Sequence, residues 1–142
     1  MTVSNGKASL HMMRVNALDH VNVQTLDIRA TVKFYAEVLD LEARDPPPPL
    51  DPKLVQWMYD ADGRAIFHLT TPGSILGDTG KAELSRETGP VHHVALNCSG
   101  HDAMVGRLSS LGLDHKLNFV EAIDLKQIFV HDPNGVLLEL NY

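Results

Sequence analysis

The chain has 142 residues, of which 44% are hydrophobic and 21% are charged, and its formal net charge is -6. This length suits one domain with a sizeable core, and the acidic balance disfavours a nucleic-acid partner. No apolar run is long enough to span a membrane, and a single cysteine, Cys98, excludes an internal disulfide framework. We therefore expect a cytoplasmic protein with neither a membrane nor a nucleic-acid partner.

The first half of the chain is predicted to form one strand, one helix and three further strands. Residues 1–13 are polar and aperiodic, and we expect them to be a flexible N-terminal segment. Asp27 is placed to cap the helix, whose apolar stripe recurs at helical spacing. The expected elements are a strand over 15–23, a helix from Asp27 to about Leu39, and strands over 41–43, 54–59 and 64–71.

The second half is predicted to have the same order of elements. The sequence Asp-Pro-Asn-Gly at 132–135 is typical of a tight hairpin turn, in which Asn and Gly accept a positive φ. The expected elements are a strand over 91–98, a helix capped by Ser99 or Asp102 that Gly112 stops after Leu111, strands over 117–121 and 126–131, and a closing strand over 136–142.

The two halves match at a nearly constant offset. His20 matches His93, Gly63 matches Gly135, and His68 matches Glu139, at separations of 73, 72 and 71 residues (93 − 20, 135 − 63 and 139 − 68). Two copies of one unit need each other to bury their apolar faces. The sequence therefore predicts one domain over 14–142, made of module one (14–72), a linker loop (73–89) and module two (90–142).

The matched positions His20, His68, His93 and Glu139 all lie on strand faces opposite the apolar ones. Taken singly, each reads more naturally as a structural histidine or a solvated edge-strand glutamate. As a set, they offer imidazole nitrogen and carboxylate oxygen, the ligands preferred by Fe, Mn, Co, Ni and Zn. We therefore expect one divalent transition metal per site, bound by these residues.

Four motifs resemble the vicinal-oxygen-chelate superfamily, which includes glyoxalase I, methylmalonyl-CoA epimerase, bleomycin- and fosfomycin-resistance proteins and extradiol dioxygenases. These motifs are LDHVNV at 18–23, KFYAEVLDL at 33–41, HHVAL at 92–96 and FVHDPNGVLLEL at 129–140. The resemblance implies an α+β fold in which two βαβββ modules in tandem form a curved mixed sheet around a metal site. It also implies that His20, His68, His93 and Glu139 are the metal ligands, and that a homodimer often completes the site.

Departures from the family patterns bear on the activity. Glyoxalase I typically has Glu at the position of His68, and the epimerase has Gln there. The extradiol enzymes have Tyr and His where this chain has Phe129 and Val120. The resemblance favours a metal-dependent, glyoxalase-like enzyme whose metal acts as a Lewis acid on a small oxygen-chelating substrate during isomerase- or lyase-type proton transfer.

Two residues are the expected catalytic groups. In this interpretation Glu139 is a ligand and a candidate base, and His68 is either the fourth ligand or the general base. Trp57 and Tyr59 are candidate pocket or dimer residues, although core packing suits both. Two alternatives stay open: an extradiol-type Fe(II) dioxygenase, and a non-catalytic protein that binds a small molecule in resistance.

Overall fold

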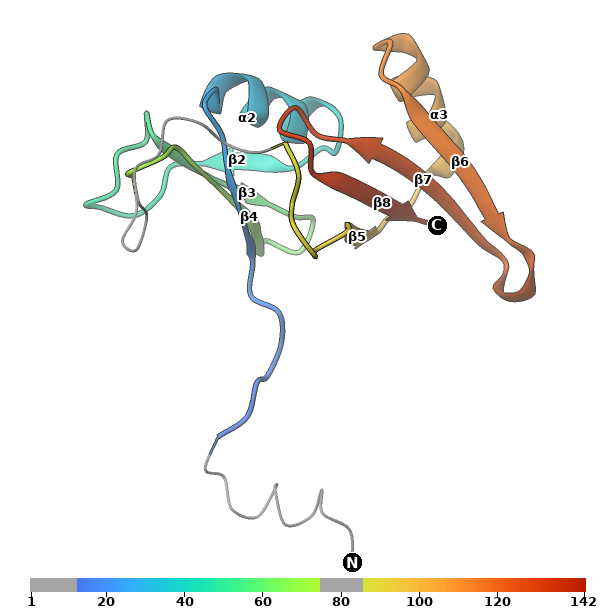
Figure 1. Cartoon of the computed structure of the whole chain (residues 1–142), viewed down its shortest axis with the longest axis horizontal. Helices are drawn as coiled ribbons and strands as arrows, with labels where there is room; N and C mark the ends of the chain where they lie inside the picture. The colour runs from blue at the N-terminus through green and yellow to red at the C-terminus, as the bar shows by residue number, and fades with distance from the viewer. Residues whose placement is uncertain (1–12, 75–85) are drawn as a thin grey trace, which may run out of the picture.

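A computed structural model describes residues 13–74 and 86–142, so the expectations for residues 1–12 and for most of the 73–89 linker lie outside the described residues. Two modules lie side by side, each with its own four-stranded sheet (Figure 1). In the first module the strand order is β1-β4-β3-β2, and β1 runs parallel to β4. Its elements are β1 (Val21–Gln24), α2 (Ile28–Glu37), β2 (Glu42–Arg44), β3 (Val55–Tyr59) and β4 (Ala65–Thr70).

The second module repeats this topology, with strand order β5-β8-β7-β6 and β5 parallel to β8. The predicted α+β fold of tandem βαβββ modules is therefore confirmed. Within the described residues, no helix is both long and apolar enough to cross a membrane. The elements are β5 (Val94–Asn97), α3 (His101–Ser110), β6 (His115–Val120), a short 3-10 helix (Glu121–Ile123), β7 (Leu125–His131) and β8 (Leu137–Asn141).

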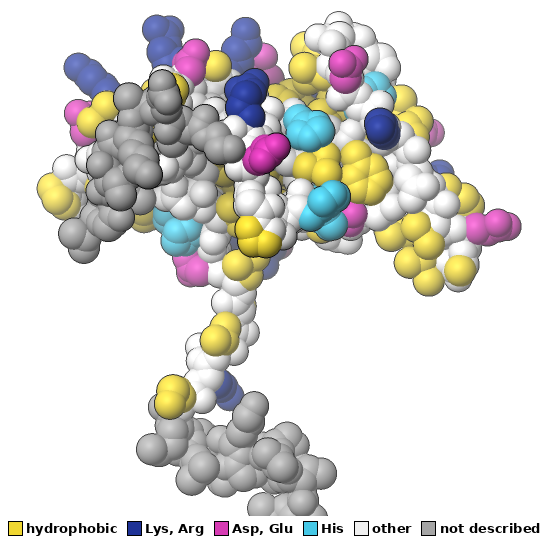
Figure 2. All heavy atoms as spheres, in the orientation of Figure 1, with side chains coloured by type: hydrophobic (Ala, Val, Ile, Leu, Met, Phe, Trp, Pro, Cys, Tyr) yellow, Lys and Arg dark blue, Asp and Glu magenta, His cyan; other side chains and the backbone are white. Residues whose placement is uncertain are grey.

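The first strand is shorter than predicted. We expected a strand over 15–23, but β1 begins at Val21, where the parallel ladder with Phe67 begins. The preceding residues run away from the body without a neighbouring strand (Figure 1). Met13, Val15 and Leu18 are 94%, 92% and 82% exposed, and Figure 2 shows hydrophobic side chains along this segment. The strand expected over 91–98 is likewise reduced to β5.

The two helices begin in different ways. The side chain of Asp27 accepts a hydrogen bond from the backbone N–H of Ala30 at 3.0 Å, as predicted. The expectation that Ser99 or Asp102 caps α3 is wrong, because Gly100 takes the N-cap position with a φ of 86° and no side-chain cap bond. A glycine reaches this left-handed conformation without steric cost, so the chain turns into α3 without a polar cap.

The core lies between the helices and one face of each sheet. Tyr35 on α2 and Leu108 on α3 are fully buried, together with Phe67, Leu69, Leu138 and Leu140 from the strands. Each of these strand residues alternates with a polar residue of the predicted site, so the alternation read from the sequence is confirmed. His68 and Glu139 consequently lie on the sheet faces turned away from the helices.

Helix α2 of the first module contacts the turn between β7 and β8 of the second. The Tyr35 hydroxyl donates a hydrogen bond to Asp132 Oδ2 at 2.9 Å, and Asn134 Nδ2 donates to Thr31 Oγ1 at 3.0 Å. Asp132 is only 5% exposed, and burial followed by the nearby Asp132 carboxylate raises the pKa of Tyr35. These side-chain bonds join the two modules within one chain.

The turn itself depends on Asp132 and Gly135. Asp132 Oδ1 accepts hydrogen bonds from the backbone N–H groups of Asn134 and Val136, at 2.8 and 2.9 Å. Gly135 has a φ of 92°, whereas Asn134 is not in the positive-φ region that we expected for both residues. A Cβ on Gly135 would clash with the backbone oxygen of Arg86, so this position requires glycine for space as well as for conformation.

Candidate metal site

His20 and His68 form one pair of candidate ligands, in the first module. His68 lies on β4, and His20 immediately precedes β1, which pairs with β4. The two rings stack with their centroids 3.6 Å apart, and Trp57 stacks on His68 with a centroid distance of 4.1 Å. Because both contacts are nearly parallel, the His68 ring is held between the other two. The register of β3 and β4 sets this arrangement, since it places Trp57 directly opposite His68.

The surroundings of His68 favour its neutral form. Burial, followed by the proximity of His20, lowers the pKa of His68 to about 4. His68 is therefore uncharged at physiological pH, which is the state required of a metal ligand. Asp19 Oδ2 lies 2.5 Å from Nδ1 of His20. A carboxylate at Nδ1 leaves the lone pair on Nε2, where a metal could bind.

His93 and Glu139 form the second pair, in the second module. Glu139 lies on β8, His93 precedes β5, and the distance from His93 Nε2 to Glu139 Oε1 is 3.5 Å. The Glu139 side chain is only 14% exposed, against 37% for His93. The parallel ladder between β5 and β8 pairs Ala95 with Glu139, so the pair results from the strand register.

His92 lies against His93, where sequence alternation did not place it. Strand alternation over 91–98 would turn His92 away from His93, but residues 91–93 precede β5 and are not part of the strand. The Nδ1 atoms of His92 and His93 are 2.9 Å apart, so the N–H group of one ring donates a hydrogen bond to the Nδ1 atom of the other. When His93 is the donor, its Nε2 carries a lone pair that faces Glu139 Oε1, which is the arrangement of two ligands for one cation.

The structure brings the four predicted residues together in two pairs rather than in one group. Within residues 13–74 and 86–142, no group of three or more His, Cys, Asp or Glu side chains is arranged to hold a metal ion. Each pair has the donor chemistry that suits a transition metal, but a catalytic site commonly uses three protein ligands. The residues therefore fit a metal only if both pairs contribute to the same site.

Both pairs lie beside an open sheet edge. Strands β1 and β5 are each at the end of their four-stranded sheet, with one hydrogen-bonded neighbour apiece in the described part of the chain. His20 directly precedes β1, and His93 directly precedes β5. Edges of this kind can pair with another strand.

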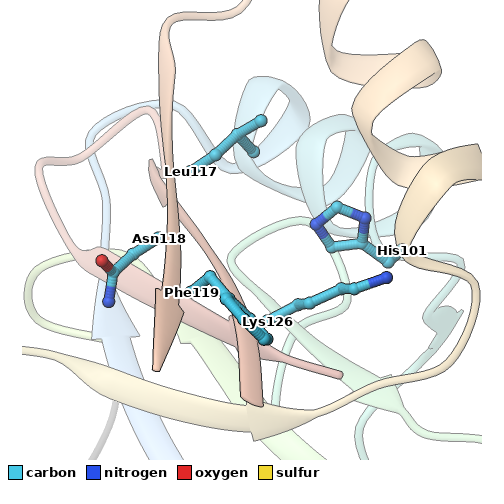
Figure 3. A pocket seen from close by; sticks show the side chains of 5 residues that line it. All are labelled: His101, Leu117, Asn118, Phe119 and Lys126. Carbon is cyan, nitrogen blue, oxygen red and sulfur yellow. The ribbon is translucent and has the colours of Figure 1, made fainter. Parts of the chain in front are cut away.

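Two cavities lie near the strands of the two modules, and neither is lined by all four candidate ligands. A crevice of about 590 Å³ between the modules is lined by His20 but not by His68, His93 or Glu139. A more open pocket of about 360 Å³ lies where β6 and β7 meet the start of α3, and its lining includes Leu117 and Phe119 (Figure 3). Neither of these two cavities is therefore a pocket built around all four candidate ligands.

Comparisons with known proteins agree with this fold. A family model described as the Glyoxalase/Bleomycin resistance protein/Dioxygenase superfamily matches residues 17–140. The protein Glyoxylase I 4 of Arabidopsis thaliana is 24% identical over 131 residues, which are 90% of this chain and 71% of that protein.

Solved structures share the fold at lower identity. A glyoxalase/dioxygenase from Nostoc punctiforme superposes with a TM-score of 0.69 at 19% identity, covering 89% of this chain and 90% of the other. A genomically encoded fosfomycin resistance protein from Listeria monocytogenes gives a TM-score of 0.64 at 16% identity, with coverage of 89% and 91%.

Proposed function

Because the chain belongs to the glyoxalase/bleomycin resistance protein/dioxygenase superfamily, we propose that it is a metal-dependent enzyme that acts on a small oxygen-chelating substrate. The observation that carries this proposal is the placement of two donor pairs, His20 with His68 and His93 with Glu139, at matching positions of the two modules. The proposed reaction is an isomerase- or lyase-type proton transfer. The proposed cofactor is one divalent ion of Fe, Mn, Co, Ni or Zn per site.

We further propose that a homodimer completes the site. One chain supplies two separate donor pairs next to the open edges of β1 and β5. A two-fold axis would place the first pair of one copy beside the second pair of the partner subunit and would create two equivalent sites. The exposed hydrophobic side chains of Met13, Val15 and Leu18, directly before His20, support a partner on this side of the molecule.

The residues of the site have distinct roles in this proposal. A bound metal would supply Lewis acidity to the substrate oxygens. Glu139 presents Oε1 toward His93 and can accept a proton there, while Oε2 is held by a hydrogen bond from Asn141. His68 stays neutral between His20 and Trp57, so it can bind the metal or accept a hydrogen bond. A pKa of about 4 makes His68 a weak general base.

The residue opposite Glu139 favours proton transfer over an oxidative reaction. Phe129 on β7 is the cross-strand partner of Glu139. The extradiol dioxygenases have a tyrosine at this position, and Phe129 lacks the hydroxyl group. We therefore propose an isomerase- or lyase-type reaction in preference to an Fe(II)-dependent dioxygenase reaction.

Metal analysis of the purified protein tests the proposed function. After incubation with Mn, Co, Ni, Zn or Fe(II) and removal of free ions, we expect close to one metal ion per chain, declining as the pH falls through the histidine range, because the ligands must be deprotonated. The variant His101→Ala is a matched control, since His101 begins α3 and contacts Tyr142 instead of the donor pairs. No uptake of any of these metals by the wild-type protein would reject the proposal.

A further inference from the structure

A row of three side-chain amides leads across the second sheet to Glu139. Asn118 Nδ2 on β6 donates a hydrogen bond to Gln127 Oε1 on β7 at 2.8 Å, and Gln127 Nε2 donates to Asn141 Oδ1 on β8 at 3.2 Å. Asn141 Nδ2 in turn donates to Glu139 Oε2 at 2.9 Å. All three bonds run in the same direction and end on the carboxylate.

The direction of these three hydrogen bonds sets the orientation of the Asn141 side-chain amide. A side-chain amide donates from its nitrogen and accepts at its oxygen. If Asn141 were flipped, its oxygen would face the Glu139 carboxylate and its NH2 group would face that of Gln127, and both contacts would be repulsive. The upstream bonds from Asn118 and Gln127 therefore keep the Asn141 donor aimed at Glu139.

Strand register and burial hold the row in place. The ladders pair Asn118 with Gln127 and Gln127 with Asn141, so the backbone sets the spacing of the amides. Gln127 is only 9% exposed, and a buried amide that loses a partner is costly. Figure 3 shows the Asn118 side chain on the opposite side of β6 from those of Leu117 and Phe119.

We propose that Asn141 is a positioning residue that fixes the rotamer of Glu139, with Gln127 and Asn118 orienting its amide. The bond from Asn141 occupies Oε2, which leaves Oε1 facing His93 Nε2 at 3.5 Å. Without this bond the carboxylate can rotate, and either oxygen or neither can face His93. The inference deepens the proposed metal site and rests on it, because it assigns Asn141 to the orientation of one of the ligands.

The first test is a Co(II) titration of the full-length wild-type protein and two variants. Asn141→Leu keeps the approximate shape of the side chain but removes the amide, and we expect a loss of about 10- to 100-fold in Co(II) affinity, as is usual for partners of metal ligands. Asn97→Ala is the matched control, because Asn97 is the cross-strand partner of Asn141 on β5 and has no hydrogen bond to Glu139 in the described part of the chain. We expect Asn97→Ala to bind Co(II) as the wild type does.

The second test needs no metal and separates the two proposals. In crystals of the metal-free wild type at neutral pH we expect a single Glu139 rotamer, and in Asn141→Leu more than one. Wild-type affinity in Asn141→Leu, or an equal loss in Asn97→Ala, would overturn the positioning role. If the wild type takes up no Co(II), the proposed function fails, and an unchanged single rotamer in Asn141→Leu would then reject the positioning role by itself.

Discussion

His68 and Glu139 are held in place by different kinds of contact. His68 lies between the rings of His20 and Trp57, so its plane is set by stacking. Glu139 is set by a hydrogen bond from Asn141 and faces His93. Stacking leaves the ring nitrogens of His68 available, whereas the hydrogen bond commits one oxygen of Glu139. This difference predicts different consequences when each side chain is removed.

We expect His68→Ala to weaken metal binding less than His93→Ala or Glu139→Ala does. Three protein ligands already hold a catalytic metal, and a fourth would occupy a position that the substrate needs. If His68 acts on the proton instead, its removal leaves the metal bound and lowers the rate by a factor of about 10² to 10⁴. Parallel metal titrations of the three variants, followed by turnover measurements on the loaded proteins, check this prediction. Equal metal loss in His68→Ala and His93→Ala would identify His68 as a ligand.

At the scale of elements, the contact between α2 and the β7–β8 turn is the most specific link between the modules. Tyr35 is fully buried, and its hydroxyl donates to Asp132, whose other oxygen is already used by the turn backbone. Arg107 on α3 adds a second link, since its Nη1 donates to the backbone oxygen of Val38 at 2.9 Å. The second module is therefore positioned by the first through side chains of helices rather than through a shared sheet.

We expect Tyr35→Phe to lower the free energy of unfolding by about 1.5–3 kcal/mol, the usual range for a hydrogen bond to a charged group. The reason is that Asp132 Oδ2 loses its donor while the carboxylate stays buried. Urea denaturation followed by circular dichroism measures the change. Tyr59→Phe is the control, because Tyr59 contacts Arg44 through its ring, and we expect it to change stability by less than about 0.5 kcal/mol. Equal effects of the two substitutions would contradict this account of the contact.

At the scale of the whole molecule, β1 and β5 each form one edge of a sheet in the described part of the chain, and β2 and β6 form the other edges. The extended residues before β1 add exposed apolar surface beside the β1 edge, as Figure 2 shows. In the proposed dimer, a second copy related by two-fold symmetry would cover the edges of β1 and β5 and this apolar surface in both chains at once. The proposed metal site also requires a second copy, because its donor pairs are separate in one chain.

We expect the protein to be a homodimer in solution. Light scattering coupled to size exclusion should give a mass close to twice the 15.6 kDa of the chain, and the mass should stay constant over a moderate dilution series. Because the site is proposed to form between copies, the metal content should fall where the dimer dissociates. A mass near 15.6 kDa at working concentration would contradict the dimer.

The sequence by itself determined the features that depend on local chemistry and on repetition. Alternation identified the faces that carry His68 and Glu139, because side chains of a strand point to opposite sides in turn. Asp27 marked the start of a helix, because an aspartate side chain can accept a hydrogen bond from the first helical N–H groups. Gly135 marked a turn, because glycine adopts a positive φ without steric cost. The repeat predicted two modules, since equal patterns fold into equal units.

The tertiary structure alone decided where strands begin and which side chains meet. β1 starts at Val21, where its parallel ladder with Phe67 on β4 begins, and the residues before it have no neighbouring strand in the described part of the chain. The amide row ending at Asn141 depends on the register of neighbouring strands, which spacing along one strand does not reveal. Four residues predicted to converge lie in two pairs, because hydrogen-bonded ladders join strands within each module and, in the described residues, none joins β1 to β5. Contacts between distant segments follow from packing, so no local pattern encodes them.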